Sequence, residues 1–183
     1  MDTIETLVGR VSPAQLAEPG PTPAQLDKIL EAAAAAPDHG RMKPWRFIVV
    51  EGEARGRLGE VMAQSLKRRE PESPEGRLDA ERRKALRSPT IVVVAATIKK
   101  NPNVPEVEQI VAAGAAAQNL LLAAHGMGLG GFWRTGAVAY DEEAKRAMGL
   151  GPDDRVVGIM YLGSVAMAGK PRETDLAAVV TRW

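Results

Sequence analysis

Apolar residues recur at helical spacing in several stretches of the chain. The clearest is TPAQLDKILEAAAAA, where Leu26, Ile29 and Ala33 fall on one face. Thr22 occupies the N-cap position of this stretch, and Pro23 lies in its first turn. The predicted helices span residues 2–9, 22–36, 53–70, 105–126 and 140–149.

Strands are indicated by short runs rich in β-branched residues. The run SPTIVVVAATI has no polar interruption at its centre, which is typical of a strand that is buried on both faces. Because helices separate the strands along the chain, the pattern predicts an α/β or α+β sandwich with a sheet of four or five strands. The predicted strands span residues 46–52, 88–98, 129–135 and 154–166.

No linker or repeat divides the chain, and 183 residues suit a single domain over 1–183. The segment 67–87 is rich in charge and is interrupted at Pro71 and Pro74. Its acidic and basic residues alternate, so we interpret it as a solvated surface segment and not as an anion site. The tail from residue 169 is expected to be irregular, with room for a short helical turn.

Composition excludes several classes of function. The formal net charge is +1, which gives no basic patch for nucleic acid, and there is no cysteine for thiolate chemistry or Cys-ligated zinc. The N-terminus has neither the basic residues nor the apolar segment of a signal peptide. The most apolar stretch, 110–124, is shorter than the roughly 20 residues of a membrane span. We therefore expect a soluble cytoplasmic protein in which any redox chemistry belongs to a bound cofactor.

The motif GMGLGG at 126–131 matches the glycine spacing of a dinucleotide-binding turn. That turn requires a strand before the glycines and a helix after them, whereas here a helix is predicted before and a strand after. The C-terminus of a helix repels phosphate. We reject the dinucleotide-binding interpretation and expect Gly126 to end the helix.

Three short stretches carry candidate chemistry. Arg10 and Ser12, two positions apart after the first helix, could both hydrogen-bond one phosphate, although such tripeptides are common in surface loops. The stretch FWRTG at 132–136 offers an indole, a guanidinium and a hydroxyl to a polar heterocycle, and it equally fits a buried Trp beside a solvated Arg. The loop PDHGRMKPWRF at 37–47 is dense in polar and aromatic groups between two regular elements, where functional sites are often found.

Taken together, MDTIETLVGRVS, APDHGRMKPWRFIVVEG, GLGGFWRTG and YLGSVAMAGKPRETDLAAVVTRW resemble the nitroreductase family of flavin enzymes. The likeness runs over nearly the whole chain and is strongest to the short bacterial branch of YdjA-type NAD(P)H nitroreductases. The resemblance implies an α+β, three-layer sandwich with a central mixed sheet of four to five strands flanked by helices. It also implies an intertwined homodimer with FMN in clefts between the subunits.

The resemblance also implies roles for individual residues. Arg10, Val11 and Ser12 are expected to hold the FMN phosphate, and His39 is expected to reach the flavin of the partner subunit. Arg172 matches a phosphate-contacting arginine of longer members. The remaining expected contacts are Trp133, Arg134 and Thr135 with FMN, and Ala123, Ala124, His125, Gly126, Met127 and Gly128 with the nicotinamide nucleotide.

The chain departs from the family pattern at three places. Val11 follows Arg10 where members often carry a second basic residue, Lys43 stands where most have Gln, and Arg41 falls where many have Asn. The last two changes add positive charge near the expected flavin.

These features predict an FMN-dependent oxidoreductase that takes electrons from NADPH or NADH and passes them to nitroaromatic or quinone-like acceptors in ping-pong order. The flavin supplies the chemistry, so we name no catalytic side chain and no metal ligand. The alternatives are a flavin-storage protein without turnover, or a family member with other flavin chemistry such as dehalogenation or flavin fragmentation.

Overall fold

The computed structural model describes residues 2–170 and 173–183. Within them, five strands form one antiparallel sheet in the order β1-β5-β3-β2, and β4 also pairs with β5. The α+β class and the number of strands are as expected from the sequence, but the expected mixture of parallel and antiparallel pairs is wrong. Between β2 and β3 the chain makes two successive helices, so it re-enters the sheet at the end it left and pairs antiparallel. The strands are β1 (Gln15–Ala17), β2 (Trp45–Glu51), β3 (Thr90–Ala96), β4 (Gly130–Arg134) and β5 (Arg155–Met167).

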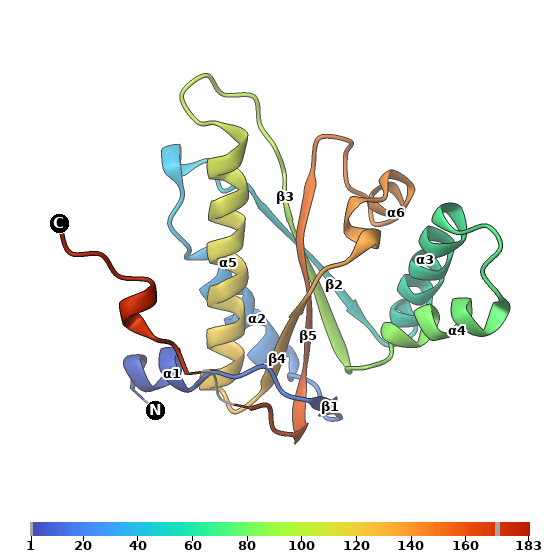
Figure 1. Ribbon diagram of the computed structural model, residues 1–183, viewed down its shortest axis with the longest axis horizontal. Helices are drawn as coiled ribbons and strands as arrows, with labels where there is room; N and C mark the ends of the chain where they lie inside the picture. The colour runs from blue at the N-terminus through green and yellow to red at the C-terminus, as the bar shows by residue number, and fades with distance from the viewer. Residues whose placement is uncertain (1, 171–172) are drawn as a thin grey trace.

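Helices cover both faces of this sheet and make three layers (Figure 1). Strand β3 shows why: Val92 and Val94 pack against α2 and α5, while Ile91 and Val93 pack toward α3 on the opposite face. All seven residues of β3 are buried, as its uninterrupted β-branched run predicted. The helices are α1 (Thr3–Gly9), α2 (Pro23–Ala34), η1 (His39–Arg41), α3 (Ala54–Arg69), α4 (Glu75–Lys84), α5 (Glu106–Gly126), η2 (Ala137–Tyr140), α6 (Glu142–Ala147) and η3 (Leu176–Ala178).

Helix α5 is the core helix of the molecule. By length and composition it could cross a membrane, and it is the one helix of the described residues that could. Its inward face, however, is built from fully buried Ala113, Ala116, Ala117 and Leu120 packed against α2 and the sheet. These small side chains let α2 approach α5 closely, which fixes both helices on one face of the sheet.

Helix α4 lies in the segment 67–87, which we interpreted as a charge-rich, solvated surface. It buries only Leu78, so it carries almost no apolar periodicity. Arg82 instead ties the helix together, since it contacts Glu75 and Asp79 on α4 and Glu60 on the neighbouring α3 at 2.5 to 2.8 Å. The solvated, charged surface was predicted from the sequence, but the helix within it was not.

Helix α5 ends at Gly126 as predicted, but a different glycine makes the turn that follows. Gly126 is the last helical residue and does not reverse the chain; Gly128 does so, with a φ of +78°. Leu129 then donates to the Ala124 carbonyl, and β4 begins at Gly130. The order helix, glycines, strand is the one for which we rejected a dinucleotide-binding turn.

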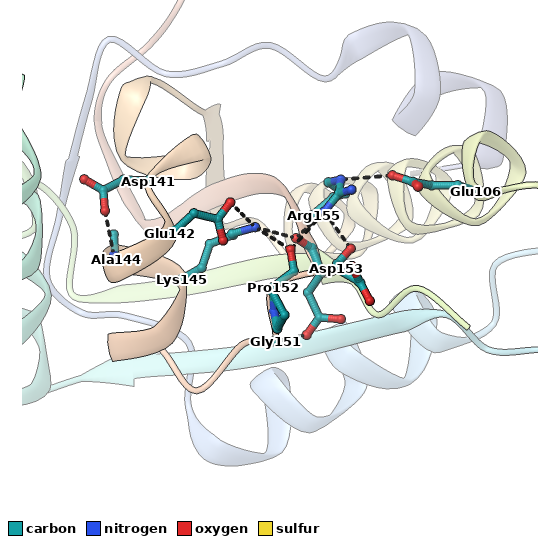
Figure 2. A network of polar contacts seen from close by, with 10 residues as sticks. Glu106, Asp141, Glu142, Ala144, Lys145, Gly151, Pro152, Asp153 and Arg155 are labelled. Atoms are coloured by element: carbon teal, nitrogen blue, oxygen red, sulfur yellow. Dashed lines mark hydrogen bonds and ion pairs between the residues drawn. The ribbon is translucent and has the colours of Figure 1, made fainter. Parts of the chain in front are cut away.

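A buried polar network fixes the start of β5 (Figure 2). Lys145 on α6 is 3% exposed, and its ammonium group donates to the carbonyls of Pro152 and Asp154 and pairs with Glu142 at 2.9 Å. Arg155 at the first position of β5 pairs with Glu106 at the start of α5. The network therefore holds the long strand in place relative to helices on both faces.

Candidate functional site

The segment after α1 and the strand β4 together form a cavity. Arg10, Val11 and Ser12 line one side, and Phe132 and Trp133 of β4 line the other. The volume is about 760 Å³, within the range of sites that hold a small organic cofactor. We call this hollow the Arg10 cavity.

Residues from the end of the chain complete the Arg10 cavity. Lys170 lies in its lining and adds a second cationic side chain. The chain reaches this place because Gly169 crosses directly against Ser12: a Cβ at position 169 would lie 1.9 Å from the Ser12 carbonyl oxygen, so only glycine fits. Arg172, which the resemblance assigns to the phosphate, lies outside the described residues.

Arg10 is the most informative residue of the cavity. Its Nε and Nη1 atoms are buried, and no described residue accepts a hydrogen bond from either. Buried donors in native proteins nearly always have a partner, and a charged group left without one is costly. Lys145 shows the contrast, because its buried ammonium group already has three partners, the Pro152 and Asp154 carbonyls and the Glu142 carboxylate. An anion in the Arg10 cavity would supply the acceptors that the described part of the chain does not.

The three predicted flavin residues at the end of β4 separate in the structure. Trp133 lines the Arg10 cavity, packs against the α2 and α5 core, and donates from its indole to the Val157 carbonyl at 3.2 Å. Arg134 points to the opposite face of the sheet, because side chains alternate along a strand. Thr135 follows the strand and is exposed.

Arg134 faces a neighbouring hollow of about 370 Å³. Its guanidinium lies 4.2 Å from the centroid of the Phe132 ring, which is a cation–π contact. Phe132 also lines the Arg10 cavity, so the two hollows adjoin at this residue. Sequence reasoning did not find this second hollow, because Leu86, Arg87 and Tyr161 reach it from distant parts of the chain.

His39 lies far from the Arg10 cavity within one chain. Its Nδ1 atom is 2.5 Å from the Glu108 carboxylate, in the first turn of α5. Arg10 follows Gly9, which adjoins His125 at the other end of that helix. At 1.5 Å per residue, positions 108 and 125 are about 25 Å apart, so one small cofactor does not span both groups.

The loop around His39 is held in an unusual backbone conformation. Gly40, Arg41 and Lys43 have φ values of +70°, +52° and +47°, and the last two are costly for residues with a Cβ. Asp38 supports the loop by accepting from the Lys43 backbone N–H at 2.8 Å, and Pro44 is fully buried. Arg41 and Lys43 are exposed, so the loop presents two cations beside His39.

The predicted nicotinamide-contacting residues form the C-terminal turn of α5. Ala124 is fully buried, whereas Gly126, Met127 and Gly128 are exposed. The carbonyls of Ala123, Ala124 and His125 already accept hydrogen bonds from the turn that follows. The structure brings this turn next to α1, but it offers a nucleotide phosphate no free N–H group of a helix N-terminus.

Comparison with known proteins identifies the class. The nitroreductase family model matches residues 14–164, so the chain belongs to the nitroreductase family, as the sequence motifs indicated.

Individual relatives extend this result. The chain is 40% identical over 164 residues to the Escherichia coli strain K12 protein named "Putative NAD(P)H nitroreductase YdjA", covering 90% of this chain and 88% of the relative. It shares its fold with a nitroreductase-like family protein from Bacillus cereus (TM-score 0.88, 23% identity, covering 100% and 96% of the two chains). It also shares the fold of a Desulfovibrio desulfuricans protein described as "a putative nitroreductase in complex with fmn" (TM-score 0.76, 22% identity, covering 100% and 98%).

The residues present fit FMN. The Arg10 cavity offers buried guanidinium donors that no described residue accepts from, together with the Ser12 hydroxyl and the Lys170 ammonium group, and these groups suit a phosphate. Trp133 lies on the opposite side of the cavity, and its indole suits packing against a planar ring.

Proposed function

We propose that the protein is an FMN-dependent oxidoreductase that uses NADPH or NADH to reduce nitroaromatic or quinone-like acceptors. Membership of the nitroreductase family and the name of its Escherichia coli relative support the reaction class. The single observation that carries the proposal is that the buried Nε and Nη1 atoms of Arg10 find no acceptor among residues 2–170 and 173–183, at a cavity that Trp133 also lines.

In this proposal Arg10, Val11, Ser12 and Lys170 bind the phosphate of FMN. Arg172 is assigned to the same phosphate on the family resemblance alone. Trp133 of β4 orients the ring, and its own position is fixed by its hydrogen bond to the Val157 carbonyl. Bound FMN supplies hydride exchange at its N5 atom, first with the nicotinamide and then with the acceptor. Because both substrates use the same exposed ring face, the kinetics are ping-pong.

No side chain of the chain is assigned an obligatory proton transfer. Thr135 borders the ring from the end of β4, whereas Arg134, expected there from the resemblance, faces the neighbouring hollow. The nicotinamide contacts expected at the end of α5 remain part of the proposal only through the residues that are exposed there, Gly126, Met127 and Gly128. We place the protein in the cytoplasm.

The active form is proposed to be a homodimer. Helix α1 has seven residues, none of them buried, and a helix of that length is marginal in water without a packing partner. His39 lies about 25 Å from the Arg10 cavity of its own chain by the length of α5, so its expected role at a flavin requires a second subunit. Exposed apolar side chains on the elements around α5 give such a partner a surface, namely Ile4, Leu7, Val8, Val107, Val111, Leu176, Val179, Val180 and Trp183.

The experiment is to titrate flavin-free protein with FMN, FAD and riboflavin while sedimentation measures its mass. The proposal predicts a dimer that binds one FMN per chain, and binds FMN more tightly than FAD or riboflavin. An absence of FMN binding at micromolar concentration would end the proposal, and a monomer loaded with FMN would remove the role of His39.

A further inference from the structure

The second hollow beside β4 has the properties of a binding site in its own right. Its floor is Tyr161 on β5, its walls are Leu86 and Phe132, and Arg87 and Arg134 stand at its rim. We call it the Arg87 cavity. It adjoins the Arg10 cavity through Phe132, but the two share no other lining residue.

Two positive charges face this cavity without a counter-ion. Neither the Arg87 nor the Arg134 side chain makes a hydrogen bond or ion pair with any residue in the described parts of the chain. Arg134 is stacked on Phe132 and lies 6.0 Å from the centroid of Tyr161, which leaves the edge of its guanidinium free to donate. Two guanidinium groups at one small hollow repel each other, and a bound anion would offset that repulsion.

The floor of the cavity adds a neutral donor. Tyr161 is 3% exposed, and its hydroxyl has no hydrogen-bond partner among residues 2–170 and 173–183. Burial raises the pKa of this phenol, although Arg134 and Arg87 act in the opposite direction. The hydroxyl is therefore protonated at neutral pH. The nearby Glu81 carboxylate is already paired with Lys84.

We propose that the Arg87 cavity binds a small aromatic carboxylate. The carboxylate accepts hydrogen bonds from Arg87, Arg134 and Tyr161, and the aromatic ring packs against Leu86 and Phe132. The volume of about 370 Å³ suits a ligand with a single ring. The inference rests on the proposed function only in assigning the adjoining Arg10 cavity to FMN.

The test measures binding of benzoate by calorimetry, with benzamide as the neutral analogue of the same shape. Both flavin-free and FMN-loaded protein are used. We expect benzoate to bind at least about tenfold more tightly than benzamide, because it alone forms charge-assisted hydrogen bonds. Arg87→Gln should weaken benzoate by at least about tenfold, and Tyr161→Phe by a smaller factor of about two- to tenfold. Arg83→Gln is the matched control, since Arg83 is exposed on α4 and does not line the cavity.

Three outcomes separate the possibilities. Benzoate binding no stronger than benzamide overturns the inference. Competition between benzoate and FMN, together with weaker FMN binding in Arg87→Gln, also overturns it, because the cavity then holds part of the flavin. Benzoate binding to a protein that takes up no FMN supports the inference and refutes the proposed function instead.

Discussion

Replacement of Arg10 by alanine should weaken FMN binding without destabilising the flavin-free protein. In the empty protein the buried Nε and Nη1 atoms of Arg10 have no partner among the described residues, so the substitution breaks no hydrogen bond there. It removes a buried, unsatisfied charge, whose desolvation costs at least about 1–3 kcal/mol. The melting temperature of flavin-free Arg10→Ala should therefore stay equal to that of the wild type or rise.

With FMN present the sign reverses. One charge-assisted hydrogen bond to the phosphate is worth about 1.5–3 kcal/mol, which corresponds to a loss of roughly ten- to a hundredfold in affinity. At an FMN concentration of about 100 times the wild-type Kd, ligand binding stabilises the wild type by about 2.7 kcal/mol. A tenfold weaker variant at the same concentration gains only about 1.4 kcal/mol.

Fluorescence titration of the flavin gives the affinities, and thermal melts with and without FMN give the stabilities. Riboflavin is the control ligand because it lacks the phosphate, and Arg134→Ala is the control variant because Arg134 faces the neighbouring cavity. Equal weakening of FMN and riboflavin, or a lower melting temperature without flavin, would show that Arg10 supports the fold and not a phosphate.

Three further predictions follow from named contacts. Gly114→Leu should convert the dimer to a monomer in sedimentation, because Gly114 lies near exposed Val107 and Val111, and a Cβ at position 114 would contact no described residue outside its own helix backbone. A dimer of unchanged affinity with a more stable helix would place the interface elsewhere. Asp141→Asn should cost about 2 kcal/mol at pH 7: burial raises the Asp141 pKa, but hydrogen bonds from Arg68 and the Ala144 N–H outweigh burial and lower the pKa from 3.8 to about 2. The wild type should lose this stability as pH falls from about 4 to 2 and the variant should not, so parallel pH profiles of unfolding would contradict the assignment. Glu108→Gln should weaken FMN binding in the dimer but leave it unchanged in a monomeric Gly114→Leu background, because Glu108 holds His39, which lies far from the Arg10 cavity of its own chain. FMN titration of the flavin-free proteins measures both affinities, and an equal effect in the two backgrounds would remove the cross-subunit role of His39.

Elements with strong periodicity could be predicted from the sequence, and elements held by distant partners could not. Helix α2 begins and ends close to its predicted limits because Thr22, Pro23 and the apolar face are local signals. Strand β1 has three residues and exists only because β5, some 150 positions later, pairs with it. Helix α4 depends on the ion pairs of Arg82, one of which reaches across to α3.

The candidate site shows the same contrast between features with a local sequence signal and features that depend on distant residues. The Arg10–Ser12 segment and Trp133 could be connected by family resemblance, and the structure does bring them to one cavity. That Arg134 turns away from Trp133 follows from strand alternation once the limits of β4 are known. The missing partner of Arg10 and the cavity shared by Arg87 and Tyr161 depend on tertiary packing, which no local pattern encodes.

Anaerobic stopped-flow mixing of the FMN-loaded dimer with NADPH, and separately with NADH, tests the central claim most directly. The account predicts that at least one nucleotide bleaches the absorption of the oxidised flavin within the time of a catalytic turnover, and that a nitroarene or quinone added afterwards restores it. A flavin that is bound but reduced by neither nucleotide at a useful rate would contradict the assignment as an NAD(P)H oxidoreductase and would identify a flavin store.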